Sequence, residues 1–206
     1  MEKIWRFVEK HLTLHPKSIK ATRIMDKIKV SQDELKRFLE AHHFVRVAIA
    51  KKMGVSESIV GDSFNHMINR HGKPMSFTKK NIELLNMALQ QIAEELSVCK
   101  LKCSNEEEAA TKRFINDDPA IIDSLRKISE YIKLRGLTAK ALGWGTRKCE
   151  SNINLKESNP RVHLKKEEIE LINNEILTVA GTLANWEVVA DENTSDGRAN
   201  MSGQGD

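Results

Sequence analysis

The chain has 206 residues, which suits one large domain or two small ones. Hydrophobic residues make up 40% of it, and no apolar run approaches the roughly 20 residues that would cross a bilayer, so we expect no membrane span. The formal net charge of +4 understates how basic the body is, because residues 190–206 carry four acidic residues against one arginine. Residues 1–104 hold 19 Lys and Arg against 11 Asp and Glu, which favours a polyanionic partner.

Residues 1–34 contain two amphipathic segments on either side of Pro16 and predict an N-terminal helical segment. The opening letters MEKIWRFVEKHL mix charged and apolar residues, which the core of a signal peptide does not tolerate. Three cysteines cannot all pair within one chain, and free thiols suit a reducing compartment. We therefore expect a cytoplasmic protein.

Residues 35–103 predict a first helical unit. The stretch AIAKKMGVSESIVGDSFNHM offers what a helix-turn-helix needs: a small residue in one helix (Ala50), a glycine at the turn (Gly54), an apolar anchor (Val55) and a capping serine (Ser56). A longer amphipathic helix follows, with its apolar stripe at Phe77, Ile82, Leu85, Leu89, Ile92 and Leu96.

Residues 104–120 are rich in acidic residues and predict a linker, with a short helix around residues 106–114. Residues 121–189 then repeat the first unit. Ala139, Gly143 and Trp144 occupy the helix-turn-helix positions, followed by Gly145 or Thr146 at the cap. A second stripe keeps the spacing of the first, at Leu164, Ile169, Ile172, Ile176, Val179 and Leu183.

The two copies also share the strings IELLN and IELIN, which place Asn86 and Asn173 in register. Residues 190–206 show no apolar periodicity and predict a disordered tail. The expected architecture is therefore all-α: two tandem helix-turn-helix bundles with an N-terminal helical extension.

The strings AKKMGVSESIV and AKALGWGTRKC resemble the lambda-repressor-like helix-turn-helix domains of phage repressors and bacterial regulators. The resemblance covers about 60 residues per copy and implies that the third helix of each unit enters the major groove of double-stranded DNA. It implies a transcriptional regulator. The DNA-binding residues it points to are Ser56, Ser58, Asn65, Arg70, Lys73, Thr146, Arg147, Lys148, Ser151, Asn152 and Lys156.

Further phosphate contacts are expected from the lysines of the second helices, Lys51, Lys52 and Lys140. The competing interpretation is a helical adaptor that binds another protein. Glu57 and Asp62 favour it, because they would turn carboxylates toward a polyanion in the first copy. In that interpretation Gly54 and Gly143 are ordinary helix C-caps. The target sequence, any effector and the oligomeric state stay open.

No glycine-rich phosphate loop, nucleophile elbow or metalloprotease helix occurs in the sequence. Cys99 and Cys103 are four residues apart, but a zinc site would need two further ligands with suitable spacing. Buried or idle thiols are the expected alternative. We therefore expect no enzyme, no cofactor and no metal site.

Overall fold

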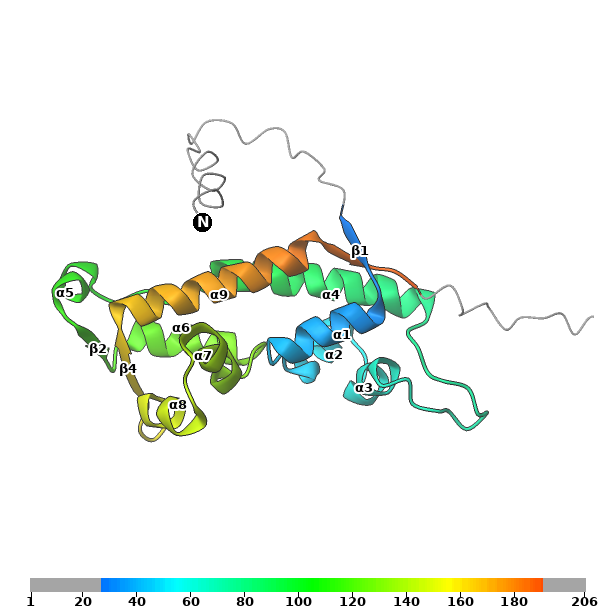
Figure 1. Cartoon of the computed structure of the whole chain (residues 1–206), viewed down its shortest axis with the longest axis horizontal. Coiled ribbons are helices and arrows are strands. Elements are labelled where there is room, and N and C mark those ends of the chain that lie inside the picture. Colours follow the sequence, from blue (N-terminus) through cyan, green and yellow to red (C-terminus); the bar gives the residue numbers. More distant parts are fainter. Residues whose placement is uncertain (1–26, 191–206) are drawn as a thin grey trace, which may run out of the picture.

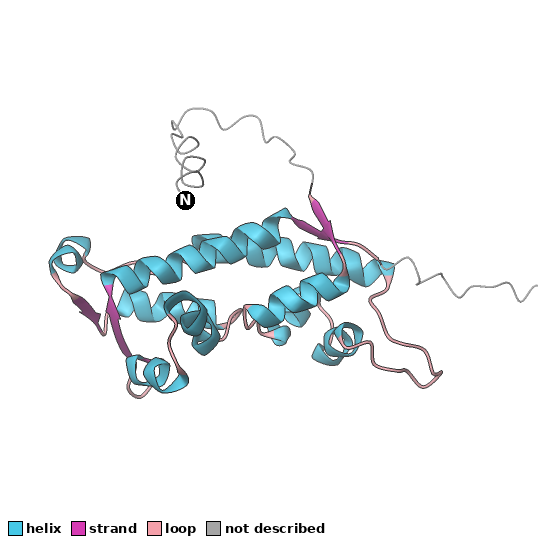
Figure 2. Ribbon diagram, viewed as in Figure 1, coloured by secondary structure: helices cyan, strands magenta, loops and turns pink. Residues whose placement is uncertain are grey.

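A computed structural model describes residues 27–190 of the chain. Within these residues, nine helices account for 60% and strands for 12% (Figure 2). The protein is therefore mostly helical, but the small sheets depart from the all-α fold that the sequence predicts. The predicted N-terminal helical segment lies outside the described residues up to residue 26, and the predicted tail lies outside them from residue 191. Residues 28–30, which the sequence places in that N-terminal segment, form a strand instead.

The first unit begins with a strand and continues with four helices. Ser31 caps the first helix: its hydroxyl accepts the Glu34 N–H at 3.2 Å, while the Glu34 carboxylate accepts the Ser31 N–H at 2.8 Å. Thr78 caps the long fourth helix, because its hydroxyl accepts the backbone N–H of Asn81. The elements are β1 (Ile28–Val30), α1 (Gln32–Ala41), α2 (Arg46–Met53), α3 (Glu57–Phe64) and α4 (Lys79–Val98).

The second unit has the same order of helices and adds a small sheet, in which β4 lies between β2 and β3 and is antiparallel to both. The segment predicted as a linker holds α5, β2 and the start of α6. The elements are α5 (Glu106–Thr111), β2 (Phe114–Asn116), α6 (Pro119–Ser129), α7 (Leu134–Leu142), α8 (Thr146–Asn152), β3 (Ile153–Asn154), β4 (Arg161–Lys165), α9 (Lys166–Asn185) and β5 (Trp186–Val188).

The two apolar stripes are buried, as the spacing predicts. Every residue of both stripes is at most 6% exposed. They lie on α4 and α9 or in the residue or two before those helices, and the buried residues of both units form one continuous core. The two units are therefore packed together rather than strung on a flexible linker.

Helices α4 and α9 run antiparallel, side by side, along the length of the molecule (Figure 1). Helices α1 to α3 and α6 to α8 lie below this helix pair in Figure 1, whereas β5 runs along its upper side and β1 descends past α4 to the start of α1. Strand β1 of the first unit pairs in parallel with β5, which follows the last helix of the second unit. The first and last strands of the described chain thus join the two units.

Asn86 and Asn173, the pair found in register, make equivalent contacts between the units. The side-chain amide of Asn86 donates to the Val188 carbonyl at 3.0 Å and accepts the Val188 N–H at 2.8 Å. Asn173 does the same with Leu101, at 3.2 and 2.7 Å. Each asparagine holds the segment that follows the other unit's long helix, so the repeat is arranged as an approximate two-fold pair.

The turns between the first two helices of each unit meet at the middle of the molecule. Phe44 and Ile132 form an antiparallel bridge. The Val45 N–H donates to the Tyr131 carbonyl at 2.8 Å, and the Lys133 N–H donates to the His43 carbonyl at 3.0 Å. These backbone bonds join corresponding positions of the two copies, which is again the pattern of a two-fold pair.

His42 lies in this central contact, between a carboxylate and an ammonium group of the second unit. Its Nδ1 is 3.0 Å from Oε1 of Glu175, and its Nε2 is 3.3 Å from the Lys140 ammonium. That arrangement assigns the proton to Nδ1 and leaves Nε2 as an acceptor. Burial, and then the charge of Lys140, hold the pKa of His42 below its ordinary value of 6.5.

We expect the protein to lose stability as the pH falls below 6.5, because the unfolded chain then binds a proton at residue 42 that the folded chain binds only at lower pH. His42→Asn keeps an N–H donor near Glu175 and cannot titrate. The urea midpoint of the variant should therefore fall less between pH 7.5 and pH 5.5 than that of the wild type. Equal falls in the two proteins would contradict the assignment of a neutral His42.

Candidate nucleic-acid interface

The first helix-turn-helix is built as the sequence predicts. Helix α2 ends at Gly54, which adopts the left-handed conformation with φ +69°, and the N–H of Val55 donates to the Ala50 carbonyl at 3.0 Å. Ser56 then caps α3 by accepting the Ile59 N–H. Ala50, the small residue predicted on the first helix of the motif, is buried at 3% exposed.

The second helix-turn-helix has the same turn with different support. Gly143 adopts φ +65° at the end of α7, and Trp144 is buried as the apolar anchor. Gly145 is the N-cap of α8 and gives no side-chain bond, so Thr146 is not the cap. Ala139 is exposed, which corrects the expectation that its small size lets α8 approach α7.

The orientation of helices α3 and α8 is fixed by inward apolar residues on each helix or directly after it. Val60 and Phe64 of α3 are at most 2% exposed, and their counterparts Cys149 and Ile153 in the second unit are 5% and 7% exposed. Ser63 of α3 is also buried, and the remaining positions of both helices face outward or lie at the edge. Both helices lie along the lower edge of the molecule in Figure 1, away from β1 and β5.

The residues predicted to bind DNA in the first unit fall into two groups. Ser56 and Ser58 are exposed at the start of α3, where their hydroxyls lie 2.9 Å apart. Asn65 is the exposed C-cap of the same helix. Arg70 and Lys73 lie farther along the chain, in the loop between α3 and α4, and both are exposed.

In the second unit, Arg147 is exposed on α8, and the described residues offer no acidic partner within ion-pair distance of its side chain. Ser151 and Asn152 instead donate to carbonyls of their own helix, at 2.9 and 2.8 Å. Thr146 is half-buried beside the turn, and Lys156 is exposed in the loop between β3 and β4. Arg147 and Lys156 are therefore the side chains best placed to meet a ligand.

Lys148 is held close to the protein. Its ammonium lies 4.4 Å from the centre of the Trp144 ring and 3.9 Å from a carboxylate oxygen of Glu168. The lysines predicted on the second helices also differ in whether another side chain of the protein engages them. Lys52 pairs with Glu95, and Lys140 lies against His42, whereas Lys51 is exposed. Lys140 thus serves the contact between the units, whereas Lys52 is paired within the first unit, to a carboxylate that also accepts the Tyr131 hydroxyl of the second unit.

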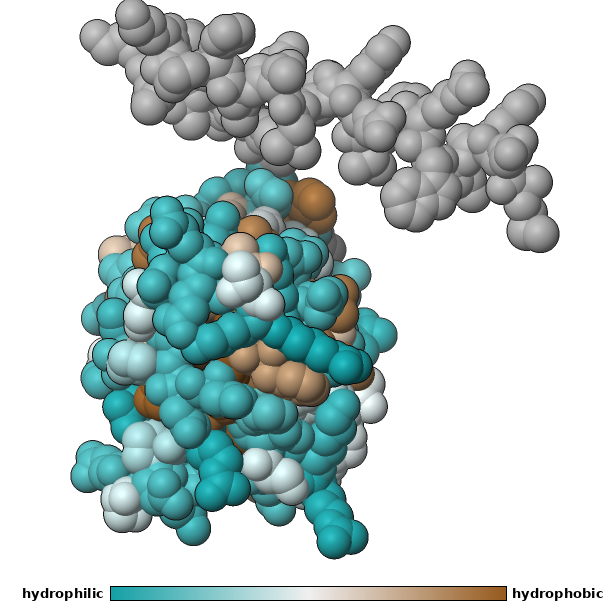
Figure 3. Space-filling model, turned by 90° about the vertical axis from the view of Figure 1, so that its left-hand side faces the viewer, coloured by the Kyte–Doolittle hydropathy of each residue, from teal (hydrophilic) through white to brown (hydrophobic). Residues whose placement is uncertain are grey.

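The charges on the two outward helices have opposite sign. Helix α3 carries Glu57 and Asp62 and no basic residue, whereas α8 carries Arg147 and Lys148 against Glu150. The end of the molecule that carries α5 and α8 is mainly hydrophilic, with a small apolar area in a hollow between polar side chains (Figure 3). The electrostatic case for a polyanion is therefore stronger at α8 than at α3.

A hairpin follows each outward helix, and the sequence interpretation missed both. After α8, β3 and β4 pair with Ile153 opposite Val162. After α3, Ile68 and Pro74 form an antiparallel bridge. In the second unit the signal was present as the alternating string RVHLK, in which Val162 and Leu164 are fully buried.

Cys99 and Cys103 are half-buried, and burial raises the pKa of both thiols, which makes them poor nucleophiles. Among residues 27–190, no cluster of three or more His, Cys, Asp or Glu side chains is arranged to hold a metal ion. None of the helices described there is both long and apolar enough to cross a membrane.

Comparison of the chain with protein-family models, with curated proteins and with solved structures finds no match. The assignment of a function to this surface therefore depends on its geometry and charge.

Proposed function

We propose that this protein binds double-stranded DNA as a transcriptional regulator, using two helix-turn-helix units related to the lambda-repressor-like class. The observation that carries the proposal is the placement of α3 and α8 at one edge of a single packed body (Figure 1). A regulator that meets one face of a duplex needs its two reading helices on one face of the protein. The approximate two-fold pairing of the units supports this use.

The second unit supplies the stronger reading helix. Arg147 presents a guanidinium that can donate two parallel bonds to guanine in the major groove. The Ser151 hydroxyl donates to the backbone carbonyl of Arg147 and so helps to fix this turn of the helix. The side chain of Arg147 stays exposed. Lys156, in the adjacent hairpin loop, is placed to contact phosphate.

A fluorescence-anisotropy titration with a mixed-sequence duplex tests the proposal. We expect micromolar or tighter binding at 50 mM salt and a loss of at least tenfold at 200 mM salt, because each phosphate contact releases counterions. Arg147→Ala should weaken binding by roughly tenfold. Lys100→Ala removes an equal charge from an exposed residue after α4 and should change binding by less than about twofold.

If the wild type does not bind duplex at 50 mM salt, the DNA-binding proposal is wrong. The acidic face of α3, with Glu57 and Asp62 and no basic residue, would then favour the adaptor function, in which this helix contacts a basic protein surface.

A further inference from the structure

The loop between α3 and α4 is a closed hairpin rather than an extended linker. The Met75 N–H donates to the Met67 carbonyl at 2.8 Å, and the Asn69 N–H donates to the Lys73 carbonyl at 2.8 Å. The side chain of Asn69 accepts the N–H groups of His71 and Lys73, at 2.8 and 3.1 Å. The tip is therefore internally bonded and holds its shape without help from the core.

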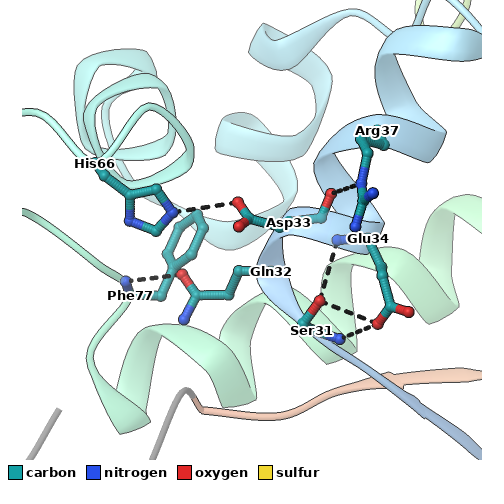
Figure 4. A network of polar contacts seen from close by, with 7 residues as sticks. All are labelled: Ser31, Gln32, Asp33, Glu34, Arg37, His66 and Phe77. Atoms are coloured by element: carbon teal, nitrogen blue, oxygen red, sulfur yellow. Dashed lines mark hydrogen bonds and ion pairs between the residues drawn. The ribbon is translucent and has the colours of Figure 1, made fainter. Parts of the chain in front are cut away.

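Helix α1 holds both ends of this hairpin (Figure 4). At the end that leaves α3, Nε2 of His66 lies 3.2 Å from a carboxylate oxygen of Asp33. At the end that enters α4, the N–H of Phe77 donates to the buried Gln32 side chain at 3.3 Å. Two neighbouring residues of one helix thus fix where the hairpin starts and returns, which presets its direction.

The stem of the hairpin is unusually apolar for an exposed segment. Met67 is 52% exposed and Ile68 is 64% exposed. Adjacent residues of an extended strand point to opposite faces, so the two side chains make both faces of the stem apolar. Burying them on a partner would be favourable, because each would remove a large apolar side chain from water.

The tip and its surroundings are strongly basic. Arg70, Lys73, Lys79 and Lys80 are all exposed, and no acidic residue occurs between Asp62 and Glu83. An apolar stem with a cationic tip fits a polyanion whose surface also has apolar walls. In a DNA groove the phosphates line the rims, while sugars and bases form the walls and floor.

The hairpin after α8 lacks this combination. Leu155 at its start is packed against the core, and Glu157 stands in its loop beside Lys156. The two units are therefore specialised differently. The second has the basic helix, and the first has the hairpin with exposed apolar and basic side chains.

Resting on the proposed DNA binding, we propose that the hairpin between α3 and α4 is a minor-groove arm, in which Met67 and Ile68 contact the groove walls and Arg70 and Lys73 hold the phosphates. The hairpin extends beyond α3 at the lower edge of the molecule (Figure 1). When α3 lies in the major groove, the groove next to it along the duplex is the minor groove. Apolar side chains are the residues that proteins insert there, and basic ones follow its narrow A·T tracts.

The test uses the full chain, a duplex that contains A·T tracts, and netropsin as a blocker of the minor groove. Met67→Ser with Ile68→Ser should weaken binding roughly tenfold and remove the competition by netropsin, with an unchanged salt dependence. Arg70→Ala with Lys73→Ala should lower the slope of log affinity against log salt concentration by about 1.8, that is, about 0.9 for each phosphate that the variant no longer neutralises.

A matched control is available on the two long helices, outside the hairpin. Met87 of α4 and Leu171 of α9 are 60% and 49% exposed, and replacing both with serine should leave affinity and netropsin competition as in the wild type. Thermal melting of each variant checks that it folds. If the Met67–Ile68 variant binds the duplex as tightly as this control, or if netropsin does not compete with the wild type, the minor-groove arm is wrong.

The remaining outcomes separate the alternatives. If Met67 and Ile68 are needed for sedimentation with phosphatidylserine vesicles but not for duplex binding, the hairpin is a membrane-surface element and the proposal is overturned. If the wild type fails to bind any duplex, the DNA-binding function falls together with the arm. If duplex binding depends on Arg147 but not on the hairpin, only the arm falls.

Discussion

Alanine at either Asn86 or Asn173 is expected to lower the free energy of unfolding by about 2 kcal/mol. Each side chain both donates to and accepts from one backbone residue of the other unit, at distances between 2.7 and 3.2 Å. Truncation therefore leaves a backbone N–H and a backbone carbonyl without partners in a partly buried position. That change costs more than the removal of an ordinary exposed hydrogen bond.

Urea denaturation followed by circular dichroism measures the effect. The two asparagines hold different segments, so the double variant should lose about 4 kcal/mol, close to the sum of the single losses. Asn174→Ala is the matched control, because Asn174 is a neighbour on α9 whose side chain makes no such contact among the described residues. A double variant as stable as Asn174→Ala would show that these contacts do not hold the units together.

Gly136→Ala is expected to destabilise the protein by about 1 to 3 kcal/mol, although alanine is normally favoured over glycine within a helix. A Cβ atom at Gly136 would lie 2.1 to 2.3 Å from Cβ, Cγ and Cδ2 of His43, well inside contact distance. His43 belongs to the central turn of the first unit, where its carbonyl accepts the Lys133 N–H. The clash therefore strains the backbone contact between the two units.

A second substitution makes this prediction specific. His43→Gly in the Gly136→Ala background should restore most of the lost stability, because it removes every clashing atom and suits the positive φ of 54° at that residue. His43→Ala should restore less, since its Cβ would still clash. Thermal melting of the wild type, Gly136→Ala and the two double variants provides the comparison. Equal rescue by both substitutions would contradict the geometry.

The parts of the fold that follow from local pattern could be predicted from the sequence. The stripes on α4 and α9 are spaced for one helical face, and they are buried. The glycines at 54 and 143 end their helices in the left-handed conformation that the turn requires. The matched Asn86 and Asn173 indicated a repeat, although their bonding partners lie 102 and 72 residues away and could not be inferred.

The sequence interpretation failed where distant segments decide the structure. Ile28–Val30 is a strand because it pairs with Trp186–Val188, at the far end of the described chain. Lys52 and Lys140 have the charge of phosphate-binding residues, but Lys52 pairs with Glu95 on another helix of its own unit, and Lys140 lies against His42 of the other unit. The hairpin after α3 has no apolar alternation, and it depends on anchors from α1.

The approximate two-fold pair is formed within one polypeptide. A regulator assembled from two separate subunits falls apart on dilution, and its occupancy of an operator then depends on the square of the monomer concentration. Here the halves share one core, so their association is independent of concentration. Under the proposed DNA-binding function, covalent fusion also frees each half from having to serve both half-sites, which allows a non-palindromic target.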